Sequence, residues 1–436
     1  CAACLARLEA LSHGGGDTLL NALRATPPSI ATADREYARD IAPRLLGLHA
    51  APELVAGAEL AGYRLLSIIG TGGMGRVWRA RHARLEQEVA VKVVAAAVDS
   101  EQVRARFEAE CDMLAQMDHP NIARLIDGGV AADGRPFFVM ELVDGVPLTR
   151  YADTANLDVR QRLHLFADVC GAVQHAHQKG IIHRDIKPSN VLVAEYDGKP
   201  IPKVIDFGIA KALGPRRAGV DRTEVGTVVG TPEYMSPEQA ALDPRDIDTR
   251  SDVYALGVLL YELLTGDTPL ARARVRGLPL LEVLRLIREE EAPPPSQRLR
   301  SATKSSTPHS ALRTPHSQEL DWITLKALDK DRTRRYGSAA ALAQDVERYL
   351  RDEPVEAGPV SAVYRARKFV RRNRVAVAAG TLVAAALIAG TAGTAIGMVE
   401  ARRAAAAAQV SEQQALTERD IAEAVRSFLQ RDLLLQ

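Results

Sequence analysis

The chain has 436 residues, of which 47% are hydrophobic and 25% are charged, and its formal net charge is +1. This length exceeds one typical domain, and the composition is that of a globular protein, which excludes a disordered chain. The near-neutral charge argues against a general nucleic-acid binder, so we expect no nucleic-acid partner. Only four cysteines occur, which predicts no disulfide framework and favours a reducing compartment.

The first informative feature in chain order is a glycine-rich run at residues 70–77, which follows a segment, residues 1–62, of unassigned role. Glycines permit a tight turn between two strands and let backbone N–H groups come close to phosphate oxygens. Alone, such a run is weak evidence, because dinucleotide-binding folds and ordinary turns contain it as well.

Residues 89–92 read Val-Ala-Val-Lys, a β-branched run of strand character that carries one lysine, Lys92. Taken alone, a lone lysine of this kind is most often an ordinary strand residue with its charge in water. Its position after the glycine run makes a phosphate-binding role the better interpretation. Two carboxylates follow in the next expected helix, Glu108 and Glu110, and either could pair with Lys92.

Residues 183–190 read His-Arg-Asp-Ile-Lys-Pro-Ser-Asn, and residues 206–208 read Asp-Phe-Gly. Phosphoryl transfer requires positioning and charge neutralisation, and Asp185 is placed to accept or orient the proton of a substrate hydroxyl. Asn190 and Asp206 are candidate metal ligands. Mg²⁺ prefers hard oxygen atoms shared between one or two side chains and the nucleotide, so no all-protein cage is expected.

The three runs, in this order, resemble the eukaryotic-type (Hanks-type) protein kinase family, and specifically its bacterial membrane-anchored Ser/Thr kinases, over residues 63–350. The resemblance implies an α+β fold with two lobes, a β-rich lobe at about 63–143 and a helical lobe at about 144–350. It further implies a non-specific serine/threonine protein kinase that uses ATP and Mg²⁺, with Mn²⁺ as an alternative metal, and acts on protein substrates. A pseudokinase scaffold is the alternative, although it would have no chemical need for the complete set of catalytic residues.

The resemblance also assigns roles to single residues. Asp185 is the catalytic base, and Lys92 holds the α and β phosphates with Glu110, rather than Glu108, as its partner. Lys187 and Thr231 indicate the Ser/Thr branch. Three residues receive structural roles: Glu238 pairs with Arg335, and Asp252 braces the catalytic loop. The residues assigned to ATP binding are Gly70, Thr71, Gly72, Gly73, Met74, Gly75, Val77, Ala90, Lys92, Met140, Glu141 and Val143.

Regulation is predicted from Arg184, which precedes the catalytic Asp and needs an anionic partner if it is held near the active site. Phosphorylation of Thr223 or Thr227, in the segment after the Asp-Phe-Gly run, would supply that charge and order the loop. The plainer interpretation is that both hydroxyls face solvent. Residues 301–317 are rich in Ser and Thr, which is typical of a mobile loop within the large lobe.

Residues 375–399 carry no charged side chain, and as a helix they would span about 37 Å, enough to cross a bilayer. Basic residues crowd the linker at 351–374, which predicts a single-pass protein of the cell membrane with a cytoplasmic kinase domain and an extracytoplasmic C-terminus. A buried Ala-rich helix is the alternative. Residues 400–436 predict an amphipathic helix that pairs in a homodimer or docks on a following domain, and the chain reads as a fragment.

Overall fold

In this computed structural model, the structure describes residues 54–72, 75–95, 101–207, 232–241, 247–302, 318–359 and 361–432. The described residues belong to two compact units, which are described separately below. The first unit contains residues up to 145 together with 178–181 and 203–207. The second contains residues 146–177, 182–202 and those from 232 onward.

The first unit is built on a six-stranded antiparallel sheet in the order β1-β2-β3-β4-β6-β5. The strands are β1 (Glu59–Leu60), β2 (Tyr63–Gly72), β3 (Gly75–His82), β4 (Glu88–Val94), β5 (Leu125–Val130) and β6 (Pro136–Glu141). Side chains alternate between the two faces of a strand. On β4, Val89, Val91 and Val93 therefore join one core cluster, while Ala90 and Val94 join the other.

One helix, α4 (Glu101–Ala115), contributes to the second of these clusters. The ring of Phe107 on α4 lies 4.7 Å from the ring of Phe138 on β6, and both side chains are fully buried. Since Lys92 alternates with Ala90 and Val94 on β4, it lies on the face of the sheet that α4 covers.

The second unit is mainly helical and is organised around α9 (Thr249–Thr265), most of whose side chains are buried. Asp248 caps its N-terminus by accepting the N–H of Arg250, and Gly266 ends it with a φ of 80°, a conformation that glycine adopts without strain. The other helices that the structure describes in this unit up to residue 350 are α5 (Leu148–Thr154), α6 (Val159–Gln178), α8 (Pro237–Ala240), α10 (Arg272–Val275), α11 (Leu280–Glu289), α12 (Pro295–Ala302), α13 (Gln318–Ala327) and α14 (Ala339–Leu350).

Short elements complete the described chain between β6 and α8. These are the strands β7 (Val146–Pro147), β8 (Val191–Tyr196) and β9 (Lys199–Val204), which form a small sheet in that order, and the 3₁₀ turns η1 (Pro188–Asn190) and η2 (Pro232–Tyr234). Helices α9 and α13 approach closely at Gly257, where an added Cβ would lie 2.9 Å from that of Ala327. A small residue is therefore required at this crossing.

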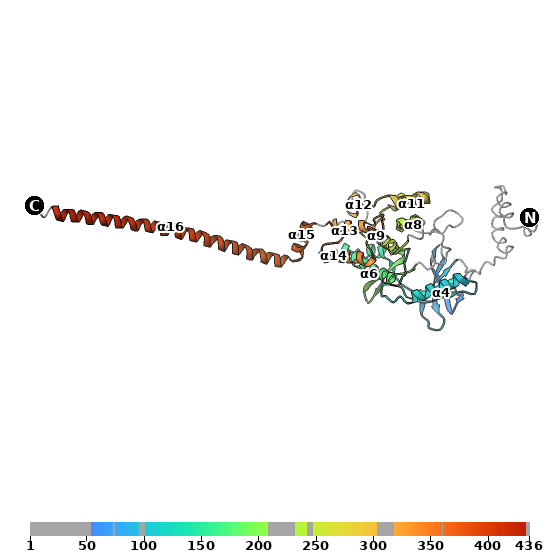
Figure 1. The fold of residues 1–436 in the computed structure, drawn as a ribbon. Helices are drawn as coiled ribbons and strands as arrows, with labels where there is room; N and C mark the ends of the chain where they lie inside the picture. Colours follow the sequence, from blue (N-terminus) through green and yellow to red (C-terminus); the bar gives the residue numbers. More distant parts are fainter. Residues whose placement is uncertain are drawn as a thin grey trace, which may run out of the picture. The chain divides into compact units, whose positions relative to one another are not determined.

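Two further helices follow, α15 (Ala362–Arg372) and α16 (Arg374–Asp432). The predicted basic linker thus contains a helix, and the predicted span and the C-terminal helix are joined as one 59-residue helix. Residues 400–432 contain neither Gly nor Pro and are rich in Ala, Glu, Gln and Arg, which explains the absence of a break. Figure 1 shows α16 running on from α15 with no described element beside it.

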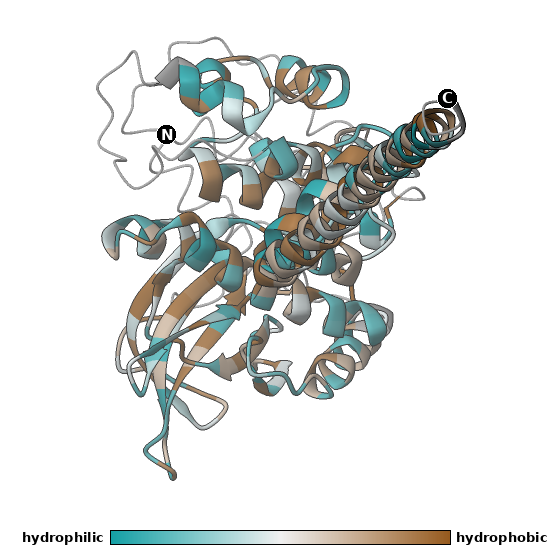
Figure 2. Cartoon of the chain, turned by 90° about the vertical axis from the view of Figure 1, so that its left-hand side faces the viewer, coloured by the Kyte–Doolittle hydropathy of each residue, from teal (hydrophilic) through white to brown (hydrophobic). Residues whose placement is uncertain are grey.

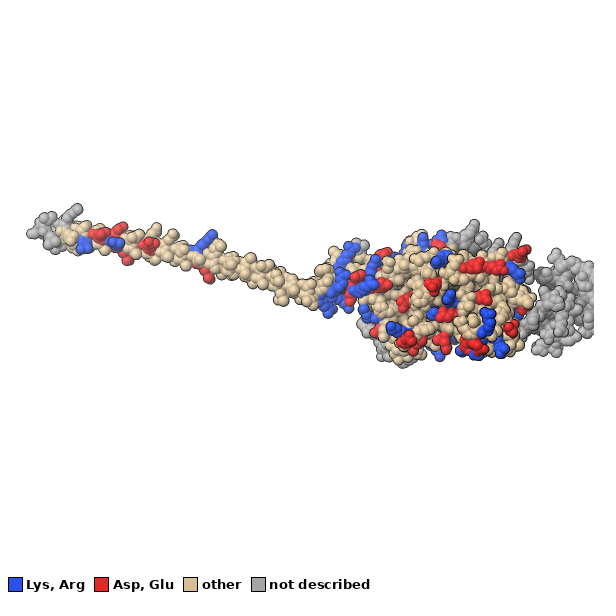
Figure 3. Space-filling view, turned by 90° about the horizontal axis from the view of Figure 1, so that it is seen from below, with Lys and Arg blue, Asp and Glu red and all other residues tan. Residues whose placement is uncertain are grey.

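Helix α16 is long and apolar enough to cross a membrane, and the apolar window is fully exposed. In Figure 2 the half near α15 is pale to brown, whereas the end near the C-terminus mixes teal and brown. Figure 3 shows the same division as a tan stretch between basic side chains at its base and mixed charges farther along. The exposed apolar surface is therefore concentrated at residues 375–399.

Candidate active site

The glycine-rich run forms the hairpin between β2 and β3. Gly72 pairs with Gly75 across the two strands, and Gly70 pairs with Val77. Gly75 has a φ of 145°, and an added Cβ would lie 2.0 Å from the carbonyl oxygen of Val93. Only glycine fits at this position, because a side chain would separate β3 from β4. Gly73 and Met74 lie outside the described residues.

Lys92 forms an ion pair with Asp206, which belongs to the same unit. Both side chains are largely shielded from solvent, with 12% and 28% of their surface exposed. Asp206 has a φ of 65°, an uncommon value that Asp tolerates better than most residues. The structure therefore brings the lysine predicted for phosphate binding together with a carboxylate predicted for metal binding.

The predicted pairing of Lys92 with Glu110 stays a prediction. Glu110 is half-buried on α4, whereas Glu108 is exposed, so the orientation of the helix favours Glu110. Its neighbour Cys111 packs at the cluster around Phe107. Burial and the surrounding carboxylates raise the pKa of the Cys111 thiol to about 12.

The strand predicted to meet the adenine is β6, which ends at Glu141. Met140 is buried and pairs with Ala90 on β4, so two residues assigned to nucleotide binding lie side by side. Lys203 Nζ forms an ion pair with Glu141 Oε1 at 2.8 Å, and the backbone N–H of Glu141 donates to the carbonyl oxygen of Arg124. Lys203 was not predicted, and no sequence signal links it to Glu141.

In the second unit, Asp185 lies at the centre of a small network. Lys187 Nζ donates to Asp185 Oδ2 at 2.8 Å. Asn190 Nδ2 donates to the backbone oxygen of Asp185 at 2.8 Å and to its Oδ2 at 3.0 Å. The pattern joins three residues predicted from the sequence, and it holds the Asp185 carboxylate between a cationic and an amide donor.

Asp252, on α9, fixes the backbone of the catalytic loop. Its carboxylate, 1% exposed, accepts the backbone N–H groups of His183 and Arg184, each at 2.8 Å. His177 Nε2 lies 2.7 Å from the same carboxylate. Arg184 has a φ of 63°, a strained value for arginine, and the bond from its N–H holds it there. His177 was not predicted, since it stands outside every recognisable motif.

The predicted pair of Glu238 and Arg335 is present as a bidentate ion pair, with N–O distances of 2.7 and 2.8 Å. Ser251 Oγ also donates to Glu238, at 2.7 Å. Burial by itself would raise the pKa of Glu238, but the hydrogen bond and charge of Arg335 outweigh it and hold the pKa below its usual value.

Ser236 precedes α8 and forms a capping box with Gln239, because the Ser236 Oγ accepts the Gln239 N–H and the Gln239 side chain accepts the Ser236 N–H. Gln239 Nε2 also donates to the backbone oxygen of Arg184 at 3.0 Å. Through these contacts the segment at α8 is tied to the loop that carries Asp185. The earlier part of that segment, including Thr223, Thr227 and Thr231, lies outside the described residues.

The two candidate metal ligands have the donor chemistry that Mg²⁺ requires. Asn190 donates through Nδ2 to Asp185, and its Oδ1 is a hard oxygen that accepts from Ser189 Oγ at 3.4 Å. Asp206 receives Lys92 on Oδ1, and its Oδ2 is a second hard oxygen. Each side chain, within its own unit, therefore offers an oxygen of the kind that a divalent cation prefers.

Comparisons of the sequence with known proteins identify a family for most of the chain. The family described as "Protein kinase domain" matches residues 63–346. Serine/threonine-protein kinase PknB of Mycobacterium tuberculosis is 38% identical over 303 residues, which cover 68% of this chain and 44% of that protein. Serine/threonine-protein kinase Pkn1 of Myxococcus xanthus is 35% identical over 319 residues, covering 73% and 42%.

Among solved structures, the PknI kinase domain of M. tuberculosis is 26% identical, with a TM-score of 0.49, and the match covers 68% of this chain and 99% of that one. The chain spans less than half the length of the curated relatives PknB and Pkn1.

Proposed function

Because the chain belongs to the protein kinase family, we propose that it transfers the γ-phosphoryl group of ATP to Ser and Thr hydroxyls of proteins. The observation that carries the proposal is the network around Asp185, in which Lys187 and Asn190 hold one carboxylate oxygen. The names of the relatives PknB and Pkn1, both Ser/Thr kinases, support the acceptor class.

The residues divide the work as phosphoryl transfer demands. Asp185 accepts a hydrogen bond from the acceptor hydroxyl, directs its oxygen toward the phosphorus, and takes the proton as the new P–O bond forms. Lys187 places a positive charge beside this carboxylate, where it offsets negative charge that develops on the transferred group. Lys92 binds phosphate oxygens of the nucleotide and so positions the group that leaves.

Asn190 and Asp206 would hold a divalent cation, and when bound it would supply positive charge beside the phosphates. The glycine-rich hairpin adds backbone N–H groups that approach the phosphates without interference from side chains. These groups are intact, which supports an enzyme over a scaffold that binds nucleotide without catalysis.

Phosphoamino-acid analysis tests the proposed activity. The full chain, purified in detergent micelles, is incubated with ATP labelled at the γ position and a mixed protein acceptor. We expect labelled phosphoserine and phosphothreonine on the acceptor. Label found only on tyrosine would reject the proposed acceptor class, and nucleotide binding without any transfer would favour the scaffold.

We further propose that residues 375–399 of α16 cross the cell membrane once, with the kinase domain in the cytoplasm. The exposed apolar window of α16 and the basic residues on its N-terminal side support this placement. Extraction of cell membranes with alkaline carbonate should leave the chain in the pellet. Protease added outside the cell should cleave after residue 399 and spare the kinase domain; the reverse pattern would reject the orientation.

Autophosphorylation at Thr223 and Thr227 remains part of the proposal. It is supported by Arg184, whose backbone is fixed beside Asp185 and whose guanidinium suits a phosphate group. Phosphopeptide mapping after incubation with ATP tests it, because a fully active chain without phosphate at either position would reject it.

A further inference from the structure

Helix α15 has an inner face that is fixed to the second unit. Lys368 is 6% exposed and pairs with Glu319 of α13 at 2.9 Å. Tyr364 donates its hydroxyl to the same carboxylate at 2.7 Å, and its ring meets that of Trp322 edge-on at 5.7 Å. Two side chains of α15 thus converge on one carboxylate of α13, so the helix is docked and does not behave as a free linker.

The turn that leads into α15 is fixed as well. Asp345 of α14 is fully buried and accepts the backbone N–H groups of Glu356 and Ala357 at 2.5 and 2.9 Å. Tyr336 donates its hydroxyl to the same carboxylate at 2.8 Å. Because both the turn and the helix are held, the orientation of α15 on the second unit is set by buried polar contacts.

The outer face of α15 is apolar and exposed. Val363 is 78% exposed, Phe369 56% and Val370 47%, and Ala362 and Ala366 complete the face. These residues recur at helical spacing, which places them on one side, opposite Lys368 and Tyr364. Such a contiguous apolar strip on an exposed helix indicates an interaction surface.

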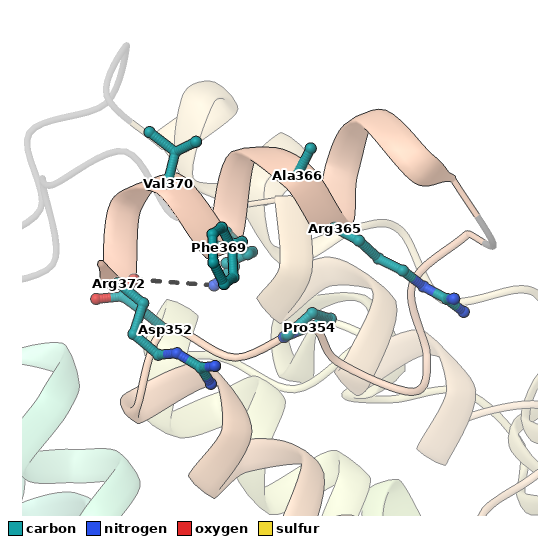
Figure 4. Close-up of a pocket in the computed structure, with 8 residues that line it drawn as sticks. Asp352, Pro354, Arg365, Ala366, Phe369, Val370 and Arg372 are labelled. Carbon is teal, nitrogen blue, oxygen red and sulfur yellow. Dashed lines mark ion pairs between the residues drawn. The ribbon is translucent and has the colours of Figure 1, made fainter. Parts of the chain in front are cut away.

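Arginines border this strip on both sides. Arg367 lies along one edge and Arg365 and Arg372 along the other, and all three are exposed, Arg372 in an ion pair with Glu353 at 3.2 Å. Figure 4 shows Ala366 and Val370 pointing to the outer side of the helix, with Arg365 and Arg372 on the side of Asp352 and Pro354. A pocket of about 420 Å³ opens there beside Phe369, with both arginines among its lining.

The strip lies next to the helix proposed to span the membrane. Only Asn373 separates α15 from α16, and the charge-free stretch begins at residue 375. If that stretch enters the hydrocarbon at its first residues, α15 is held within the headgroup region. Figure 3 shows the corresponding concentration of basic side chains at the base of α16.

We propose that α15 lies in the interface of an anionic bilayer, with Val363, Phe369 and Val370 at the boundary of headgroups and acyl chains and the bordering arginines on lipid phosphates. The inference rests on the proposed membrane span of α16. An apolar strip edged by arginines on both sides fits an anionic lipid surface. A second copy of the same face would bring like charges together along both edges, so the bilayer is the better occupant.

This placement has a consequence for the enzyme. Helix α15 is bonded to α13 through Glu319, and the turn before α15 is bonded to α14 through Asp345. If α15 lies flat on the membrane, these contacts therefore fix the orientation of the second unit relative to that membrane. Protein substrates at the membrane surface would then meet the catalytic loop in a restricted orientation.

Quenching of tryptophan fluorescence by brominated lipids tests the proposal on the full chain in nanodiscs. The discs contain brominated phosphatidylcholine, either alone or with about one third anionic phosphatidylglycerol. Val370→Trp reports on the outer face of α15. Leu281→Trp is the matched control, since Leu281 is 77% exposed on α11, which Figure 1 places at the other end of the second unit. The parent chain corrects for Trp78 and Trp322.

We expect at least twofold more quenching at position 370 than at 281, strongest in the anionic discs. The double variant Arg365→Ala/Arg367→Ala should lose most of the dependence on anionic lipid, whereas Arg334→Ala, an exposed arginine after α13, should keep it. Equal quenching at 370 and 281 in a chain that is incorporated in discs would overturn the proposal, as would crosslinking of two copies through position 370. Failure of the chain to enter discs at all would instead reject the membrane span.

Discussion

Replacement of Glu238 by Gln would remove one charge from a buried ion pair while keeping the shape of the side chain. Arg335 is 0% exposed at its side chain and Glu238 is 8% exposed, so the guanidinium would stay buried without its carboxylate. Removing one partner of a buried pair destabilises a protein by about 3–5 kcal/mol. The carbonyl oxygens of Asp329, Arg250 and Lys330 still accept from Arg335, which places the expected loss near the lower value.

A loss of about 3 kcal/mol corresponds to a fall in Tm of about 5 °C, because unfolding of the domain at residues 63–346 has an entropy of about 0.6 kcal/mol/K. Differential scanning fluorimetry of the full chain in detergent measures it. Glu282→Gln is the matched control, because Glu282 pairs with Arg285 on the exposed surface of α11 and should change Tm little. Equal melting of Glu238→Gln and Glu282→Gln would refute the reasoning.

The same pair gives a pH dependence. Arg335 lowers the pKa of Glu238 in the folded state, so the stabilisation is complete above the ordinary glutamate pKa of about 4.5 and is lost as pH falls through the lower folded value. The difference in Tm between the parent chain and Glu238→Gln should therefore shrink at acid pH. A difference that stays constant below pH 4.5 would contradict the assignment.

Three further changes test other parts of the structure. Asp252→Asn places an amide donor where the carboxylate accepts two backbone N–H groups and faces His177, and a buried donor without an acceptor costs about 1–3 kcal/mol. We therefore expect kcat to fall about tenfold while KM for ATP changes little. An unchanged kcat would show that activity does not depend on these hydrogen bonds to the loop. Gly75→Ala would force a Cβ against the carbonyl oxygen of Val93 and should lower Tm, whereas Gly72→Ala, which has open space, should not; equal Tm values would reject this steric account. Burial and neighbouring carboxylates raise the pKa of Cys111 to about 12, so its thiol should react with iodoacetamide at pH 8 more slowly than a cysteine of ordinary pKa, by between about one and two orders of magnitude. Peptide mass spectrometry measures this rate, and a rate like that of a free peptide would contradict the burial.

The grouping of the candidate catalytic residues around Asp185 was predictable because their signals are local. Asp185, Lys187 and Asn190 stand within six positions, and the structure joins them through short contacts that need no distant element. Asp252 and the pair of Glu238 with Arg335 were accessible only through the resemblance to a family, since the chain separates the members of each contact by dozens of residues.

The docking of α15 could not be predicted, and the reason is physical. A run of basic residues reads as a solvated linker, but Lys368 is buried because Glu319, far away in the sequence, supplies its counter-charge. Asp345 gives no signal either, since its partners are backbone N–H groups of a turn. The unbroken course of α16 through residue 400 was likewise missed, because a change in hydropathy does not by itself end a helix.

Phosphoryl transfer by Asp185→Asn tests the central claim most directly. The substitution keeps the size of the side chain and removes the carboxylate that accepts the hydroxyl proton, while Lys92 and the glycine-rich hairpin are untouched. We expect ATP binding to be nearly unchanged and transfer of label to Ser and Thr to fall to background, with Asp197→Asn, on the β8–β9 turn, as an active control. Undiminished transfer by Asp185→Asn would contradict the assigned mechanism.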